Sequence, residues 1–428
     1  MGKVGQSLIC EADARPTKTV ATPPVWAKGS HATVSSGEKR VQRVDSAGSI
    51  ARADRFLADC VRATLRGSDC PPWSQELDGA QAEVISRIDF HGIALLLAGS
   101  MPDSLPRVLQ ESILEQARLQ ALWEISHGQR VAQLVEALHA RGFEPLLMKG
   151  TAIAYSCYDD PAMRRRGDTD IVLAGAERDN ARRCLRALGF RPRGHHFGLQ
   201  EAWVVDAQGG FTHEVDVHWA MSSSTTLAAA LAQNGFETRT IALPRLSANA
   251  RSLGLVDNIL MICINRQAHN MLGYHIEGER VFDSERLIWA VDLDLMCARL
   301  DASDWSLLSD ISHRSGAAGT VLAGLLFARD RLGTGIPDRC IDSLSAETAE
   351  GPVSRYLAQQ SNFQRFRQDF AAAPDWGIRR GLVLRQVFPE RDVLEDRFPD
   401  KRHWPNVALY TWRLLQSASA LLRFGRNG

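Results

Sequence analysis

Two carboxylates lie one residue apart, at Asp168 and Asp170, directly before the apolar run 171–173. Side chains two residues apart on a strand project from the same face, so we expect these two acids to point together. A third acid, Asp216, lies in the strand candidate 211–219 and can join them from a neighbouring strand. Mg²⁺ prefers oxygen ligands and is often shared between carboxylates and substrate phosphates, so three convergent acids indicate a metal and phosphate site.

The spacing of the acids also suits a pair of metal ions. In two-metal sites the ions lie about 3.5–4 Å apart and stabilise the attacking and leaving oxygens of an in-line displacement. Asp168 or Asp170 would suit the bridging position between them. The alternative is a surface turn, because aspartate after glycine also bonds its own backbone in turns. Short motifs match by chance often, so the interpretation depends on the elements around the acids.

A strand followed by a glycine turn lies upstream of the acids. Residues 144–148 predict a short buried strand, Lys149-Gly150-Thr151 ends it, and residues 152–158 resemble a helix. Glycine and a hydroxyl residue at such a junction let backbone N–H groups approach a phosphate, assisted by the field of the helix N-terminus. The pattern therefore predicts a triphosphate cradle, although Gly150 alone is equally typical of an ordinary turn.

Further elements follow the acid pair. We expect a helix over 176–188 that ends at Gly189, and strands over 190–193, 202–205 and 211–219, the last two joined by a hairpin at 208–210. Period-two alternation in the last strand places Glu214, Asp216 and His218 on one polar face. Both Glu214 and Asp216 could be the third ligand. We choose Asp216, because Glu214 lies two residues further from the pair His218-Trp219.

These segments together resemble the core of the DNA polymerase β-type nucleotidyltransferase superfamily, and more narrowly a bacterial family of uncharacterised nucleotidyltransferases. That family reads approximately Leu-Leu-Lys-Gly, then Tyr-x-x-Pro-x-x-Arg-x-x-Gly-Asp-x-Asp, then an acid followed by x-His-Trp. The matching residues are Leu146, Leu147, Lys149, Gly150, Tyr158, Pro161, Arg164, Gly167, Asp168, Asp170, Asp216, His218 and Trp219.

The resemblance implies an enzyme that transfers a nucleoside monophosphate from an NTP, with ATP as the first candidate, to an unidentified small-molecule or protein acceptor. It implies Mg²⁺ or Mn²⁺ as cofactor, with Asp168, Asp170 and Asp216 as catalytic and metal-binding residues. The implied nucleotide-binding residues are Lys149, Gly150, Thr151, Arg164 and Gly167. Thr151 replaces the usual serine and Thr169 the usual aliphatic residue, and neither change removes a ligand.

Four residues are candidates for support of the site or for the acceptor side. They are His218, His269, Arg286 and Asp292, of which the last three match recurring family positions on C-terminal helices. Each has a structural alternative. A histidine beside a tryptophan at a strand end is commonly a packed, hydrogen-bonded residue, and Arg286, Trp289 and Asp292 on one helix face can form a buried polar network.

Composition narrows the class of protein. Lys plus Arg equals Asp plus Glu at 50 each, which argues against binding to extended nucleic acid, and 45% apolar content is typical of a globular chain. The eight cysteines show no zinc-ligand spacing and are most simply reduced thiols of a cytoplasmic protein. No apolar run reaches the roughly 18–20 residues that a membrane span requires.

The predicted fold class is α+β, with a small polymerase β-type core of mixed sheet and helices between two helical domains. We expect a disordered leader over 1–50, an N-terminal helical region over 51–141, the nucleotidyltransferase core over 142–226 and a C-terminal helical domain over 227–428. In the last of these, the expected helices span 256–271, 284–300, 304–315, 318–332, 352–372, 376–387 and 406–424.

Two other classes of function remain open from the sequence. One is a catalytically silent nucleotide-binding module that regulates a partner, although all three acids are present. The other is a helical interaction protein in which the α/β core is only structural. Metal-dependent NTP turnover separates the enzyme from both alternatives.

Overall fold

A seven-stranded mixed sheet and the helices around it make up most of the structure, which confirms the predicted α+β class. The computed structural model describes residues 39–173, 177–194, 198–276, 279–281, 285–346, 351–359, 361–389, 391, 394–395, 398–413 and 415. These residues belong to one compact unit, Ser35–Gly428. Residues 1–38 of the predicted leader, and residues 414 and 416–424 of the predicted last helix, lie outside the described residues.

The sheet has the strand order β3-β4-β5-β2-β1-β7-β6. Its strands are β1 Leu146–Met148, β2 Asp168–Val172, β3 Arg191–Arg193, β4 Gln200–Asp206, β5 Thr212–His218, β6 Ile241–Ala242 and β7 Arg251–Ser252. The central pair β2 and β5 is parallel, whereas β1 pairs antiparallel with β2, and β4 antiparallel with β5. All five strands that the sequence predicts, β1 to β5, are present.

Four further strands come from the region predicted to be helical. The sheet extends past residue 226 through β6 and β7, and a separate hairpin joins β8 Tyr274–Ile276 to β9 Glu279–Val281. Each of these strands has only two or three residues, so none is long enough to show the alternation of polar and apolar residues by which a strand is predicted.

The N-terminal helices are α1 Lys39–Arg66, α2 Gln81–His91, α3 Ala94–Leu97 and α4 Arg107–His139. Pro106 precedes the first residue of α4, where the missing N–H of proline costs nothing. The second half of α4 packs its buried Val131, Leu134 and Leu138 in one cluster with Ile171 of β2. This helix therefore covers the back of the strand that carries the acid pair.

The remaining helices are α5 Lys149–Cys157, α6 Arg178–Ala187, α7 Thr225–Leu231, α8 Leu255–Leu272, α9 Leu287–Cys297, α10 Ala302–Ser315, α11 Ala318–Leu332, α12 Asp338–Ser345, α13 Pro352–Ala358, α14 Asn362–Ala372 and α15 Trp376–Val387. Short 3₁₀ turns occur at Gln75–Leu77, Pro161–Met163, Gln208–Gly210, Ala232–Asn234, Phe236–Arg239 and Pro399–Lys401. The single helix predicted over 352–372 is wrong, because Ser361 caps a new helix by accepting a hydrogen bond from the Gln364 amide. Residues 406–413 are helical, as predicted.

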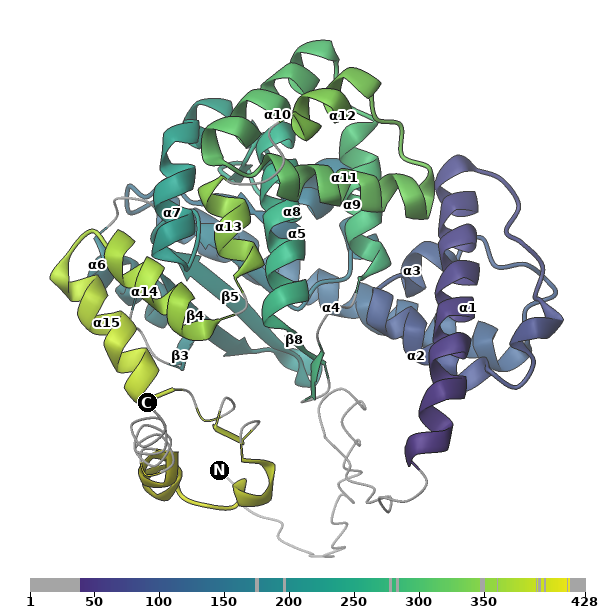
Figure 1. Cartoon of the computed structure of the whole chain (residues 1–428), viewed down its shortest axis with the longest axis horizontal. Coiled ribbons are helices and arrows are strands. Elements are labelled where there is room, and N and C mark those ends of the chain that lie inside the picture. The colour runs from purple at the N-terminus through teal and green to yellow at the C-terminus, as the bar shows by residue number, and fades with distance from the viewer. Residues whose placement is uncertain are drawn as a thin grey trace, which may run out of the picture. The chain divides into compact units, whose positions relative to one another are not determined.

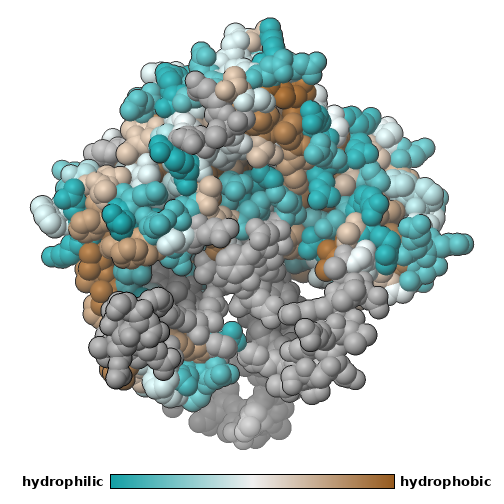
Figure 2. All heavy atoms as spheres, viewed as in Figure 1, coloured by the Kyte–Doolittle hydropathy of each residue, from teal (hydrophilic) through white to brown (hydrophobic). Residues whose placement is uncertain are grey.

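Figure 1 shows α8, α9 and α11 packed together, and α1 of the N-terminal helices packs against α11. No described helix is long and apolar enough to cross a membrane. The face drawn in Figure 2 is mainly hydrophilic, with smaller hydrophobic areas between the polar side chains. The seven cysteines within the described residues are free thiols.

A buried histidine connects the N-terminal helices to α9. The Nδ1 atom of His91 accepts a hydrogen bond of 3.1 Å from the Leu287 amide, so its proton is on Nε2, which lies 2.8 Å from a carboxylate oxygen of Asp54. Burial lowers the pKa of His91 from 6.5 to about 4, against the effect of the Asp54 carboxylate. The imidazole is therefore neutral in the folded protein at neutral pH.

Acidification should destabilise the protein through this residue. Between pH 6.5 and 4 the unfolded chain protonates His91 and the folded chain does not, so the free energy of unfolding falls as the pH falls. A pKa difference of this size corresponds to at most about 3 kcal/mol. We expect denaturation curves to show that the free energy of unfolding falls more in the wild type than in His91→Gln when the pH is lowered from 6.5 to 4. Equal pH dependence in the two proteins would contradict the assignment.

Candidate functional site

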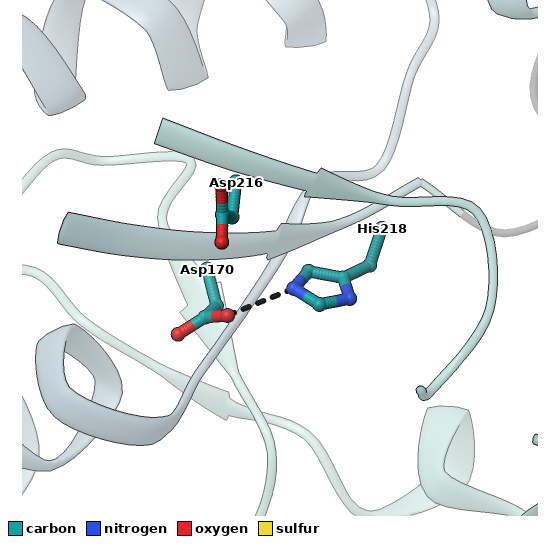
Figure 3. A group of neighbouring side chains, drawn as sticks. All are labelled: Asp170, Asp216 and His218. Atoms are coloured by element: carbon teal, nitrogen blue, oxygen red, sulfur yellow. Dashed lines mark hydrogen bonds and ion pairs between the residues drawn. The ribbon is translucent and has the colours of Figure 1, made fainter. Parts of the chain in front are cut away.

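The predicted acids lie on one face of the central strand pair. In the parallel ladder Asp170 of β2 is the partner of Asp216 of β5, and Asp168 is the partner of Glu214. Figure 3 shows Asp170, Asp216 and His218 close to one another on these two strands. One ligand atom from each of these three residues lies within 4.8 Å of the others. Asp168 is not part of this close group and lies exposed at the beginning of β2.

His218 contacts Asp170 directly. Its Nε2 lies 2.8 Å from Oδ1 of Asp170, and burial lowers the pKa of the imidazole, although the carboxylate acts in the opposite direction. A neutral ring with Nε2–H as donor leaves Nδ1 unprotonated, and this atom is buried without a hydrogen-bond partner among the described residues. His218 thus holds the orientation of Asp170, in the way that neighbours of metal-binding carboxylates commonly do.

Lys149 supplies the positive charge of the site. Its Nζ donates a hydrogen bond of 2.6 Å to the same Oδ1 of Asp170, and its side chain is 22% exposed. Among described residues it is the only one besides glycines with a positive φ, at 54°. This left-handed conformation is unfavourable for a residue with a Cβ, and such strain is characteristic of functional sites. The chain adopts it where β1 ends and α5 begins.

The three acids have different protonation properties. Although burial opposes ionisation, Lys149 and His218 keep the pKa of Asp170 well below its usual range. Burial and the neighbouring Asp170 raise the pKa of Asp216 to about 8. Asp168 keeps contact with solvent, yet desolvation by the surrounding protein and the charge of Asp170 raise its pKa to about 6. One ammonium group therefore does not neutralise the negative charge of this face.

A divalent cation fits these side chains. Oδ1 of Asp216 is buried and has no hydrogen-bond partner among the described residues, while Oδ2 accepts a hydrogen bond from Nε2 of Gln200. A buried carboxylate oxygen without a partner is costly, and a hard cation would satisfy it. Asp170 and Asp216 would hold the ion, and Asp168 could reach it from the exposed side.

The glycine turn lies beside the acids. A Cβ atom added to Gly150 would lie 3.5 Å from the nearest atoms of Arg164 and Arg166, which is an ordinary contact, and one added to Gly167 would meet nothing within 4 Å. Packing inside the protein therefore does not require glycine at either position. The backbone of Gly150 lies in the first turn of α5, where N–H groups and the helix field favour an anion.

The side chains of Thr151 and Arg164 are bonded within the protein. The buried hydroxyl of Thr151 accepts a hydrogen bond of 2.9 Å from Arg166 Nε and lies 2.7 Å from the hydroxyl of Thr169. Arg164 pairs with the fully buried Asp292 at 2.7 Å, and the Tyr158 hydroxyl donates to the same carboxylate at 2.8 Å. Asp292 thus belongs to a buried polar network with Arg164 and Tyr158.

The other two candidates lie on the helical side. The ring of His269 on α8 stacks on Trp289 with centroids 5.8 Å apart. Burial and the nearby charge of Lys149 lower the pKa of His269 to about 4, so this histidine is close to the acid site. Nε of Arg286 donates a hydrogen bond of 2.7 Å to the Phe90 carbonyl, which connects the beginning of α9 to α2.

Gln200 is a site residue that the sequence prediction missed. Its side chain donates to Asp216 from the neighbouring strand β4. The prediction began this strand at Ala202, two residues too late, and so left Gln200 outside it. A strand extended to residue 200 would have placed Gln200 on the same face as Ala202, whose register partner is Asp216.

Comparison with known proteins identifies the class. Residues 79–333, more than half of the chain, match the family described as "Uncharacterised nucleotidyltransferase". The chain belongs to this family. The matched range includes every predicted site residue, from Lys149 to Asp292, and ends before α12. No curated protein sequence matches the chain.

Proposed function

We propose that this protein is a metal-dependent nucleotidyltransferase of the polymerase β type, which transfers a nucleoside monophosphate from an NTP to a small-molecule or protein acceptor. One observation carries the proposal. Asp170 and Asp216 face each other from parallel strands, and Asp216 keeps a buried oxygen without a partner, beside a glycine turn at a helix N-terminus. Membership of a nucleotidyltransferase family supports the same reaction class.

Each part of the site has a role in this reaction. The backbone N–H groups at Gly150 bind the triphosphate at the N-terminus of α5. Lys149 keeps Asp170 ionised, and His218 fixes its orientation. Bound Mg²⁺ or Mn²⁺ would neutralise charge on the phosphates and lower the pKa of the attacking hydroxyl.

Asp216 acts on the acceptor side. It either accepts the proton of the acceptor hydroxyl or holds the ion that binds this hydroxyl, and both roles require the ionised carboxylate. Burial and the charges of the neighbouring acids, which raise its pKa to about 8, both oppose that ionisation. We propose ATP as the first nucleotide to test, and no extended nucleic acid as acceptor, because the acidic and basic residues balance at 50 each.

The test compares two acids on the same strand face. Asp216 is half-buried and contacts Gln200, whereas Glu214, two residues earlier, pairs with Arg193, whose side chain is 60% exposed. We expect Asp216→Asn to lower product formation by at least about 100-fold, since loss of a general base alone costs roughly 10²–10⁴. We expect Glu214→Gln to stay within about threefold of the wild type, because Glu214 is paired with Arg193 and is not part of the close group of Asp170, Asp216 and His218.

The measurement uses each α-labelled NTP with Mg²⁺ or Mn²⁺ and a lysate of the source cell as the supply of acceptors. Label in a macromolecular or small-molecule fraction, together with pyrophosphate release, identifies the acceptor class. NTP binding without any label transfer or pyrophosphate release would favour a silent nucleotide-binding module instead. An unchanged melting temperature with both NTP and metal would favour the helical interaction protein.

A further inference from the structure

A row of polar side chains runs through the protein behind the acid strand. It begins at Arg166, whose Nε donates to the hydroxyl of Thr151 at 2.9 Å. The Thr151 hydroxyl lies 2.7 Å from that of Thr169, and the Thr169 hydroxyl lies 2.7 Å from Nε2 of His127. Thr169 stands between the two acids of β2, with its side chain on the opposite face of the sheet.

The row continues across two histidines to the surface. Nδ1 of His127 lies 3.3 Å from Nδ1 of His213, and Nε2 of His213 lies 2.7 Å from the hydroxyl of Ser126. All members are buried except Ser126, which is half-buried. The row therefore joins α5, β2, β5 and α4, the elements that carry or cover the candidate site.

The first donor decides the direction of every hydrogen bond in the row. Arginine can only donate, so the Thr151 oxygen accepts from Arg166, and the Thr169 hydroxyl is the acceptor that the described contacts offer to the Thr151 proton. The Thr169 proton then goes to Nε2 of His127. A neutral imidazole that accepts at one nitrogen donates from the other, so His127 donates from Nδ1, and His213 donates from Nε2 to Ser126.

The opposite direction leaves a proton without an acceptor. If Ser126 donated first, the protons would run toward Thr151, which would then accept from both Arg166 and Thr169. The proton of the Thr151 hydroxyl would have no acceptor among the described contacts, at a buried position where an unmet donor is costly. Burial lowers the pKa of His127 and lowers that of His213 to about 4, so both rings are neutral at pH 7.

The beginning of the row is itself fixed. Arg166 pairs with Glu124 of α4 at 2.8 Å, and the Tyr155 hydroxyl donates to the same carboxylate at 2.8 Å. A Cβ atom on Gly128 would lie 2.4 Å from the Tyr155 oxygen, so α4 needs glycine here for the tyrosine to approach. The row therefore extends from a fixed ion pair on α4 and returns to the same helix at Ser126 and His127.

We propose that this directed row makes Thr169 and His127 positioning residues, which hold the Gly150-Thr151 turn and the acids of β2 and β5 in register. The role of these residues in catalysis rests on the nucleotidyltransferase function proposed above. The direction of the hydrogen bonds does not, because it follows from the geometry of the row alone. The two parts are therefore tested separately.

Nitrogen-15 NMR of protein labelled at histidine tests the direction. We expect His127 in the Nδ1–H tautomer and His213 in the Nε2–H tautomer at pH 7, with the two signals assigned by their loss in His127→Gln and His213→Gln. The reverse pair of tautomers, or a protonated ring at either position, would overturn the proposed direction. This result does not depend on any enzymatic activity.

A matched pair of substitutions at Thr169 tests the positioning. Thr169→Val keeps the shape of the side chain and removes the hydroxyl, whereas Thr169→Ser keeps the hydroxyl and serves as the control. We expect Thr169→Val to weaken Mn²⁺ binding and to lower kcat/KM for the NTP at least tenfold, and Thr169→Ser to stay within threefold of the wild type. Equal Mn²⁺ affinity of the wild type and a folded Thr169→Val would overturn the positioning role.

The outcomes separate the two proposals. A wild type that binds Mn²⁺ but transfers no nucleotide contradicts the proposed function, while the loss of Mn²⁺ affinity in Thr169→Val still supports positioning. A folded Thr169→Val that transfers nucleotide as fast as the wild type contradicts positioning alone. A wild type that binds no Mn²⁺ contradicts both.

Discussion

Replacement of Asp170 by asparagine is expected to abolish nucleotide transfer. The substitution keeps the size of the side chain but removes its negative charge. In the wild type, Oδ1 of Asp170 accepts a hydrogen bond of 2.6 Å from Nζ of Lys149 and lies 2.8 Å from Nε2 of His218. A metal site lends several kcal/mol to such a reaction, and each 1.36 kcal/mol corresponds to a tenfold change in rate. We therefore expect turnover to fall by about 10³-fold or more, together with the loss of Mn²⁺ binding.

The control for this result is Asp206→Asn. Asp206 is also an acid of the sheet, but it lies at the exposed end of β4, where it pairs with the exposed Arg191. We expect this variant to keep wild-type turnover. Pyrophosphate release measures the activity, and circular dichroism verifies that both variants are folded. A folded Asp170→Asn protein with more than a tenth of the wild-type rate would contradict the assigned site.

Replacement of Asp292 by alanine is expected to cost about 3–5 kcal/mol in the free energy of unfolding, the usual effect of removing one partner from a buried ion pair. The Asp292 side chain is fully buried and accepts hydrogen bonds from both Arg164 and Tyr158. Without it, the Arg164 guanidinium would remain buried with no counter-charge. Urea denaturation followed by circular dichroism measures the loss.

An exposed ion pair provides the comparison. Asp59 and Arg62 lie one helical turn apart, with side chains 46% and 43% exposed, and Asp59→Asn should change stability by less than about 1 kcal/mol. The double variant Arg164→Leu with Asp292→Leu should regain part of the loss, since it leaves no unpaired charge. If Asp292→Ala and Asp59→Asn were equally stable, the buried pair would not have the structural role assigned here.

The local features of the fold could be predicted from the sequence because each depends on neighbouring residues. Period-two alternation predicts that Asp168 and Asp170 share a face, and it also places Asp216 on the polar face of its strand. The β2 and β5 pairing then brings Asp170 and Asp216 together. Helices α11 and α15 span the predicted residues 318–332 and 376–387, and α11 is followed by Gly333, whose left-handed backbone is the usual C-terminal cap.

Other features depend on contacts between distant parts of the chain. The pairing of Arg164 with Asp292 joins residues 128 positions apart, and nothing near Arg164 indicates that its charge is neutralised inside the protein. The predicted contact of Arg164 with phosphate remains a prediction, as do the roles of His269 and Arg286. The polar row through Thr169 and His127 was missed for the same reason, although the unusual threonine between the two acids was its visible sign.

The pairing of β2 with β5 has a consequence for how this protein could change during evolution. Asp170 and Asp216 are direct register partners in one parallel ladder, so the separation of their backbone positions follows from the strand spacing of about 4.8 Å. Backbone hydrogen bonds on both sides of β2 maintain that spacing. Loops and outer helices can therefore diverge in sequence and length while the two backbone positions that carry these carboxylates stay side by side.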